Sequence, residues 1–256
     1  MAGLTLTFVA AGALFYAALC AVLYFAQRSL LYFPTRESHV ATADIWRLEV
    51  QGAALKVWRV PGSGDRALLY FGGNSEDVAN QVQALATLLP ARPLYVVNYR
   101  GYGGSTGTPS EDALLADAET VFDAVRAQHP AVDVIGRSLG SGVAMHVAAV
   151  RDVHKLVLIT PFDSVEGVAR QRFAVIPVAL LLKDRFDSLG KVPRVRAPTL
   201  VLTASRDRVV PRANTERLVA AFPPQQVSNV VVEGANHDSI TSSPDYTHAL
   251  REFLRD

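Results

Sequence analysis

The sequence has a single cysteine, Cys20, and nearly equal numbers of basic and acidic residues. One cysteine excludes an internal disulfide and any metal site built from several thiolates. The formal net charge of +1 supplies neither a basic surface for nucleic acid nor an acidic excess, and so favours small-molecule or lipid-like partners. Half of the residues are hydrophobic, which argues against a disordered chain.

Charged side chains are also absent from residues 2–27. As a helix, the apolar stretch 4–26 would span about 35 Å, which exceeds a hydrocarbon core of about 30 Å. The sequence therefore predicts a single-pass membrane protein with a transmembrane anchor over residues 1–27. A cleaved signal peptide is the alternative, but its basic n-region and shorter apolar core are missing. A lipoprotein at Cys20 is disfavoured because Leu19 stands where a small residue is expected.

Aromatic and basic residues follow the apolar stretch, as they do at a membrane interface: Tyr24, Arg28, Tyr32 and Phe33. Arg28 and Arg36 come after the stretch, whereas only the amino terminus is basic before it. The positive-inside rule then favours the cytoplasmic side for the rest of the chain.

The remainder divides into a juxtamembrane linker, residues 28–44, and one α/β domain, residues 45–256. Two strand-like runs around Gly52, 46–50 and 55–60, predict an opening hairpin. Short apolar runs rich in β-branched residues then suit strands buried on both faces: 67–71, 93–99, 132–135, 155–159, 199–204 and 229–233. Helical patterns alternate with them over 76–89, 108–130, 212–222 and 244–255. This alternation predicts a mainly parallel central sheet with helices on both faces.

Local signals refine two of these segments. The helix from residue 108 is expected to begin with a capping box, in which Thr108 pairs with Glu111 and Pro109 takes the first helical position. Residues 160–198 form a connection of about 40 residues, which is too long for an ordinary crossover. This insertion includes the apolar stretch 173–182 and is either a lid over the site or an extra helix at the sheet edge.

Two segments match the pattern Gly-x-Ser-x-Gly, one containing Ser105 and the other Ser138. A nucleophilic serine in this pattern needs a strand that runs into it and a helix that leaves it, because the sharp turn raises the hydroxyl above the sheet. Ser138 has both, whereas Ser105 lies in a glycine-rich loop. Ser138 could instead only cap its helix. A dinucleotide-binding motif is excluded because the third small residue of that fingerprint is missing.

A serine nucleophile needs a histidine base, and in folds of this kind the histidine is the last of the three groups along the chain. Four histidines follow Ser138. His146 and His248 fall within helices, and His154 precedes a strand, so none of them would lie at the carboxyl ends of the strands. His237 directly follows a strand in a loop with glycine and asparagine, which favours it as the base over a surface-loop role.

The acid that orients the base should also follow a strand. Asp207 lies just beyond the run 199–204, and Asp163, one strand earlier, is the rival. Either aspartate could instead serve a turn or a helix cap.

Acyl transfer also requires two backbone donors for the oxyanion. The first is expected to be the N–H of Leu139. The second is expected to be the N–H of Asn74, with Gly73 supporting it, because Gly72 and Gly73 allow a close backbone approach after the strand 67–71. Asn74 or Ser75 could also cap the next helix.

Together these segments resemble the α/β-hydrolase superfamily and, within it, the BEM46-like membrane-anchored serine hydrolases. The resemblance rests on QRSLLYFP, YFGGNSED, NYRGYGGSTG, VIGRSLGSGVA, PTLVLTASRDRVVP and GANHDS, and covers nearly the whole chain. It implies an α/β-hydrolase fold with a small lid insertion, an amino-terminal anchor, and the triad Ser138, Asp207 and His237. Members are assigned to ester or thioester hydrolysis, often on acylated or lipid-like substrates. The sequence departs from that family at Gly72, where a histidine is usual, and within 203–207, where a glycine is usual.

The favoured hypothesis is a membrane-anchored serine hydrolase that cleaves carboxylic esters or thioesters through an acyl-enzyme, without metal or cofactor. Its substrate would be a small-molecule or lipid-like acyl compound. A serine peptidase and a catalytically silent membrane scaffold are the alternatives. The sequence defines neither the acyl group nor the oligomeric state.

Overall fold

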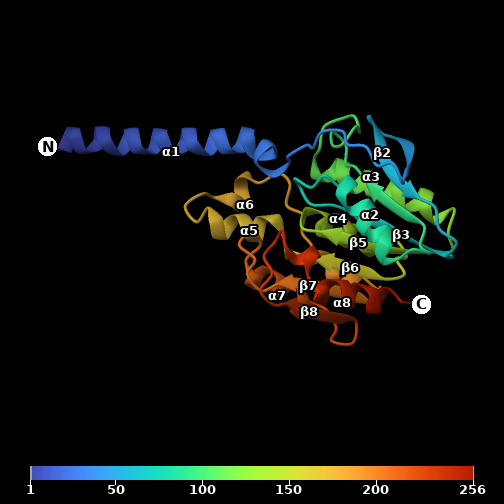
Figure 1. Cartoon of the computed structure of the whole chain (residues 1–256). Coiled ribbons are helices and arrows are strands. Elements are labelled where there is room, and N and C mark those ends of the chain that lie inside the picture. The colour runs from blue at the N-terminus through green and yellow to red at the C-terminus, as the bar shows by residue number, and fades with distance from the viewer. Residues whose placement is uncertain (1, 256) are drawn as a thin grey trace.

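The computed structural model describes residues 2–255 and contains an eight-stranded sheet (Figure 1). Its strands are β1 Asp44–Val50, β2 Ala53–Val60, β3 Arg66–Phe71, β4 Leu94–Val97, β5 Ala131–Arg137, β6 Leu156–Ile159, β7 Thr199–Ala204 and β8 Val227–Val232. The strand order is β1-β2-β4-β3-β5-β6-β7-β8. Strand β2 is antiparallel to both neighbours, and every other adjacent pair is parallel. The predicted hairpin and the mainly parallel sheet are confirmed.

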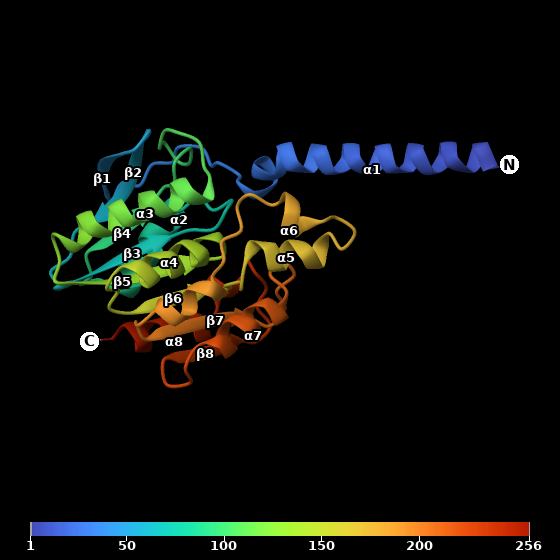
Figure 2. The same ribbon diagram turned by 180° about the vertical axis from the view of Figure 1, so that it is seen from behind.

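Helices cover both faces of the sheet (Figures 1 and 2). Helices α3 Glu111–Arg126, α4 Leu139–Val150 and α7 Arg212–Ala221 pack on one face, and α2 Ala79–Leu88 and α8 Pro244–Leu254 pack on the other. Side chains alternate along each strand, so Leu69 and Phe71 of β3 join the first core, whereas Leu68 and Tyr70 join the second. The strands are apolar on both faces because both faces are covered.

The parallel direction of β3, β5, β7 and β8 brings the loops that follow them to one edge of the sheet. These loops contain the site residues predicted from the sequence. Ligands of open α/β sheets bind at this edge, outside the carboxyl ends of the strands.

The first helix, α1 Ala2–Leu31, projects away from the domain (Figures 1 and 2). The most apolar 18-residue stretch of its segment Thr5–Leu31 has a mean hydropathy of 2.2, and none of that stretch is buried. At about 1.5 Å per residue, it is long enough to cross a hydrocarbon core of about 30 Å. The segment therefore fits a single transmembrane helix, and α1 continues beyond the predicted boundary at residue 27.

The insertion between β6 and β7 contains two helices and a 3₁₀ turn: α5 Val165–Arg172, α6 Val178–Leu181 and η1 Leu189–Arg194. Helices α5 and α6 lie beside the carboxyl-terminal half of α1 in both views (Figures 1 and 2). Pro177 stands directly before α6 and divides the apolar stretch 173–182 into a loop and one short helix.

The predicted start of α3 is wrong. The N-cap is Ser110 rather than Thr108, and the Ser110 side chain accepts no capping hydrogen bond. A carboxylate from the insertion caps the helix instead, because Asp184 Oδ1 accepts the Glu111 N–H at 3.3 Å. The Glu111 carboxylate in turn accepts the N–H of Arg185 at 2.5 Å. A tertiary contact thus replaces the local capping box. Helix α2 likewise begins at Ala79, after the predicted residue 76, and is not capped by Asn74 or Ser75.

Candidate active site

Ser138 occupies a sharp turn between β5 and α4. Its backbone has φ 50° and ψ −117°, in the left-handed half of conformational space that a residue with a side chain rarely adopts. The flanking glycines make the turn possible. A Cβ at Gly136 would lie 2.2 Å from the Gly140 oxygen, and one at Gly140 would lie 2.1 Å from the Phe71 oxygen. The Gly-x-Ser-x-Gly pattern is therefore required here by steric contact.

The structure brings Ser138, His237 and Asp207 together. Ser138 Oγ lies 2.9 Å from His237 Nε2, and His237 Nδ1 lies 2.7 Å from Asp207 Oδ2. The side chains of His237 and Asp207 are 10% and 6% exposed. These three residues follow β5, β8 and β7, as the sequence predicted.

Asp207 is fixed by its own turn. Its second oxygen, Oδ1, accepts the N–H groups of Val209 and Val210 at 2.8 and 2.9 Å. An ionised carboxylate only accepts hydrogen bonds, so His237 Nδ1 must carry the proton that faces Asp207. The other nitrogen, Nε2, is then free to accept the Ser138 hydroxyl proton, as a general base requires.

The other three histidines that follow Ser138 lie apart from it. His146 Nε2 lies 2.7 Å from a Glu119 carboxylate oxygen, and His154 Nδ1 lies 2.7 Å from an Asp133 carboxylate oxygen. His248 is exposed on α8. None of these three is hydrogen bonded to Ser138.

The rival serine and aspartate have structural partners. The Ser105 hydroxyl accepts the Lys56 N–H at 2.8 Å and donates to the Asn98 oxygen at 2.9 Å. Both its acceptor and its donor capacity are therefore used by hydrogen bonds within the fold. Asp163 Oδ1 accepts from the Asn214 amide at 2.7 Å and ties the insertion to α7. Neither residue is hydrogen bonded to His237.

The expected oxyanion donors flank Ser138. Leu139 is the first residue of α4, so its N–H points out of the helix start toward the site. Among the described residues, the Asn74 N–H has no hydrogen-bond partner. The Gly73 N–H instead donates to Glu76 Oε2 at 2.7 Å. A Cβ at Gly73 would lie 3.6 Å from the Ser138 Cβ, which is an ordinary van der Waals contact, so Gly73 lies beside the nucleophile without being required there by steric contact.

Asn74 is held by the last residue of α1 and by the chain that follows it. Its amide donates to the Leu31 oxygen at 2.8 Å. Its own backbone oxygen accepts the Phe33 N–H at 3.1 Å and the Tyr102 hydroxyl at 2.8 Å. Burial raises the pKa of Tyr102 to about 12, so this hydroxyl remains a donor at neutral pH. The juxtamembrane segment therefore orients the expected oxyanion donor.

Glu76 and Arg137 were missed by the sequence reasoning. Arg137 Nη1 pairs with Glu76 Oε1 at 2.8 Å, and Arg137 Nη2 donates to the His237 oxygen at 3.3 Å. Tyr70 also donates its hydroxyl to the Glu76 carboxylate at 3.0 Å. Burial disfavours the charge on Arg137, but Glu76, together with Tyr70 and Asp238, outweighs this effect and raises the pKa of Arg137. An arginine at the end of a buried strand needs such a partner, and that was the available signal.

Gly72 stands where the resembled family carries histidine. A Cβ there would lie 2.4 Å from Val78 Cγ1, so a larger residue would require the Val78 side chain to move. The Tyr99 hydroxyl donates to the Gly72 oxygen at 2.9 Å, and Glu76 holds the next residue. These contacts fix the loop without the histidine.

A cavity of about 270 Å³ opens over Ser138 and His237. Its other walls are polar and include Asn74, Glu76 and Asp238. This space is suited to the polar part of a substrate around the reacting bond.

The fold and this arrangement of residues define the chain as an α/β hydrolase. The model of the Alpha/beta hydrolase family matches residues 60–190. The uncharacterized protein Rv2307c of Mycobacterium tuberculosis is 35% identical over 214 residues, which are 79% of this chain and 75% of that protein. The chain therefore belongs to the α/β hydrolase family.

A further relative and two solved structures are also similar to this chain. The alpha/beta hydrolase domain-containing protein aho-3 of Caenorhabditis elegans is 31% identical over 73% of this chain and 57% of its own length. Among solved structures, the Pyrococcus furiosus esterase Pf2001 superposes with a TM-score of 0.72 at 16% identity, over 88% of this chain and 98% of that chain. A membrane phospholipase A described as a bacterial virulence factor superposes with a TM-score of 0.65 at 20% identity, over 98% and 96%. These two superpositions show a shared fold.

Proposed function

We propose that this protein is a membrane-anchored serine hydrolase that cleaves carboxylic esters or thioesters through Ser138, His237 and Asp207. One observation carries the proposal: the hydrogen-bonded chain from Ser138 Oγ to His237 Nε2, and from His237 Nδ1 to Asp207 Oδ2. A serine hydroxyl is a poor nucleophile at neutral pH unless a base removes its proton during attack. In this series of hydrogen bonds, His237 is the base and Asp207 is the carboxylate that orients it.

The reaction proceeds in two halves. Ser138 Oγ attacks the carbonyl carbon while His237 Nε2 takes its proton, and the N–H groups of Leu139 and Asn74 stabilise the oxyanion that forms. His237 then gives the proton to the departing alcohol or thiol, which leaves an acyl group on Ser138. Water, deprotonated by His237, attacks this acyl-enzyme. The acid is released and Ser138 recovers its proton.

Three further features support this assignment over a peptidase or a silent scaffold. The strained backbone at Ser138 is a cost that functional sites commonly carry. The similar solved structures include an esterase and a phospholipase, both of which act on ester bonds by their descriptions. The apolar helix α1 is long enough to cross a bilayer, and as an anchor it would hold the domain beside acylated substrates in the membrane. By the positive-inside rule, Arg28 and Arg36 favour a cytoplasmic domain.

Labelling with a fluorophosphonate tests the proposal directly, because this reagent forms a covalent bond with an activated serine. The wild-type protein is expected to label, and Ser138→Ala is not. Ser105→Ala is the matched control, since it removes the serine of the other Gly-x-Ser-x-Gly segment, and it should label like the wild type. Equal labelling of Ser138→Ala and wild type would exclude Ser138 as nucleophile. A panel of p-nitrophenyl esters, a thioester and a peptide amide then separates esterase, thioesterase and peptidase.

A further inference from the structure

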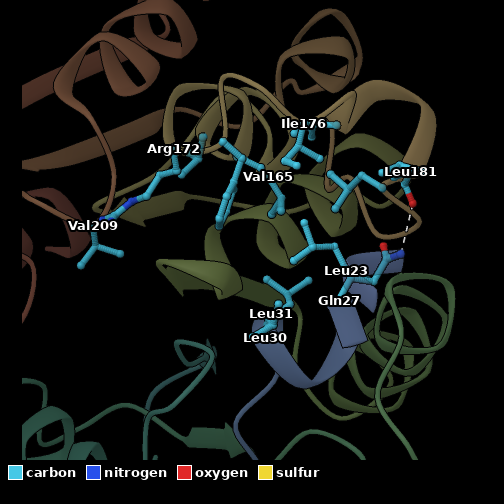
Figure 3. A pocket seen from close by; sticks show the side chains of 14 residues that line it. Leu23, Gln27, Leu30, Leu31, Val165, Arg172, Ile176, Leu181 and Val209 are labelled. Atoms are coloured by element: carbon cyan, nitrogen blue, oxygen red, sulfur yellow. Dashed lines mark hydrogen bonds between the residues drawn. The ribbon is translucent and has the colours of Figure 1, made fainter. Parts of the chain in front are cut away.

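A second cavity, of about 430 Å³, lies between α1 and the insertion (Figure 3). Leu23 and Leu31 of α1 face Val165 and Ile176 of the insertion across it. Its walls are almost entirely aliphatic and aromatic, and the polar groups at its rim belong to Gln27 and Arg172. A cavity of this size and polarity suits an apolar ligand.

The insertion reaches far along the transmembrane segment. The Tyr16 hydroxyl donates to the Val175 oxygen at 2.6 Å. Tyr16 precedes Tyr24, the first residue of the expected interfacial belt, by a helical rise of about 12 Å. With α1 spanning the bilayer, the loop around Val175 would lie at the depth of the hydrocarbon core. Its exposed side chains suit that depth, because Val175 is 77% exposed, Leu180 83% and Phe173 47%.

The base of the insertion carries the groups of an interface. Gln27 donates its amide to the Leu181 oxygen at 3.1 Å and accepts the Lys183 N–H at 2.7 Å. The Lys183 ammonium lies 4.0 Å from the centre of the Tyr24 ring. Gln27 thus places polar groups at one edge of the cavity, whereas its other walls are almost entirely apolar, Leu31 at the domain end of α1 included.

Two residues in the walls of this cavity are hydrogen bonded to residues of the candidate active site. Leu31 accepts the hydrogen bond from the Asn74 amide. Val209 donates its N–H to the Asp207 carboxylate. One wall therefore belongs to the segment that holds an oxyanion donor, and another belongs to the turn that holds the acid.

We propose that this cavity binds the acyl chain of a bilayer-resident ester or thioester, with α1 forming one wall of the site. The inference rests on the proposed function and names its substrate class. The chain would enter from the hydrocarbon core between α1 and the loop around Val175, and the carbonyl group would reach Ser138 at the polar cavity. On this proposal the anchor takes part in binding the substrate besides attaching the domain to the membrane.

Adjacent residues of α1 provide a matched test. Leu23 lines the cavity, whereas Val22 is 63% exposed and faces away from it. The full-length protein is placed in phospholipid nanodiscs, and kcat/KM is measured on p-nitrophenyl dodecanoate and butanoate. Each methylene group that leaves water is worth about a fourfold gain, so filling the cavity should lower the dodecanoate-to-butanoate ratio by about tenfold or more. Leu23→Trp, and Ala169→Trp from the facing wall, should show this loss. Val22→Trp should keep the ratio within about twofold.

Equal ratios in all four proteins would overturn the acyl site while leaving hydrolysis itself established. No turnover by the wild type would instead overturn the proposed function, and a binding measurement then decides the acyl site separately. A palmitic acid that bears a photoreactive diazirine is crosslinked to the Ser138→Ala protein. Crosslinks within 23–31 and 165–182 that palmitate competes away and Leu23→Trp reduces are the expected result. Crosslinks confined to 5–19 would overturn the proposal.

Discussion

Arg137, the residue before the proposed nucleophile, forms an ion pair of 2.8 Å with Glu76 of the loop after β3. Both side chains are nearly buried, at 12% and 8% exposure. Through this pair, the loop that carries the expected oxyanion donor is joined to the backbone of the expected base, because Arg137 also donates to the His237 oxygen. The pair therefore sets the distance between two groups that the reaction needs on opposite sides of Ser138.

Glu76→Gln should impair the reaction more than Arg137→Lys. The first change leaves the nearly buried Arg137 charge with only the exposed Asp238 carboxylate, at 3.8 Å, which costs up to about 3–5 kcal/mol, whereas the second keeps a cation beside Glu76. We expect kcat to fall about 100-fold for Glu76→Gln, because a small misplacement of an oxyanion donor has effects of this size. The rate of fluorophosphonate labelling, measured below the melting temperature of each variant, checks the loss of reactivity. Thermal melting of the same samples measures the loss of stability. A lower melting temperature with an unchanged labelling rate would mean that the ion pair has a structural role only.

Asp207→Asn and Asp163→Asn form a matched pair of changes in two strand-end aspartates. Asn at 207 can donate to His237 Nδ1 and so favours the wrong tautomer, and we expect kcat/KM to fall by about 10³–10⁴. Asn at 163 weakens the bonds to Asn214 and Arg217 and should lower the free energy of unfolding by about 1–3 kcal/mol with little change in kcat. Ester hydrolysis and urea denaturation measure both effects. The opposite pattern would make Asp163 the acid.

The sequence was sufficient to predict the sheet and the residues that follow its strands, because short apolar runs mark strands and parallel strands end at one edge. Ser138, Asp207 and His237 could be proposed on that basis. Glu76 could not, because its role depends on Arg137, which is close in space and distant in sequence. The Thr108 cap failed for a related reason, since Asp184 of the insertion supplies the carboxylate that a local box would have supplied. Local patterns predict such ends only where no tertiary partner competes.

Tyr102 should make stability fall at high pH. Burial raises its pKa from 10.0 to about 12, so the folded state holds the phenolic proton more tightly than the unfolded chain. This contribution is complete below pH 10 and is lost as the pH rises from 10 to 12. Other buried tyrosines titrate in the same direction, so the contribution is isolated by difference. We expect Tyr102→Phe to remove about 2 kcal/mol of the loss between pH 10 and 12. Urea denaturation at a series of pH values measures the two slopes, and identical slopes would contradict the assignment.

Arg28 should hold the insertion in place. Its guanidinium donates to Asp184 at 2.9 and 3.2 Å, and the same nearly buried carboxylate caps α3 through the Glu111 N–H. Arg28→Ala removes a charge-assisted bond worth about 1.5–3 kcal/mol and leaves Asp184 with one backbone donor. Because the insertion then loses its main ionic contact with α1, trypsin should cleave after Lys183 or Arg185 several-fold faster in nanodiscs.

Arg36→Ala is the control for this change, since it removes a juxtamembrane arginine for which no ion pair with another described residue is found. Cleavage of that variant should match the wild type. If Arg28→Ala also matches it, the insertion is held by its apolar contacts with α1, and the pair with Asp184 serves only the start of α3. If cleavage rises, dodecanoate hydrolysis should fall with it, because an insertion released from α1 no longer encloses the proposed acyl site.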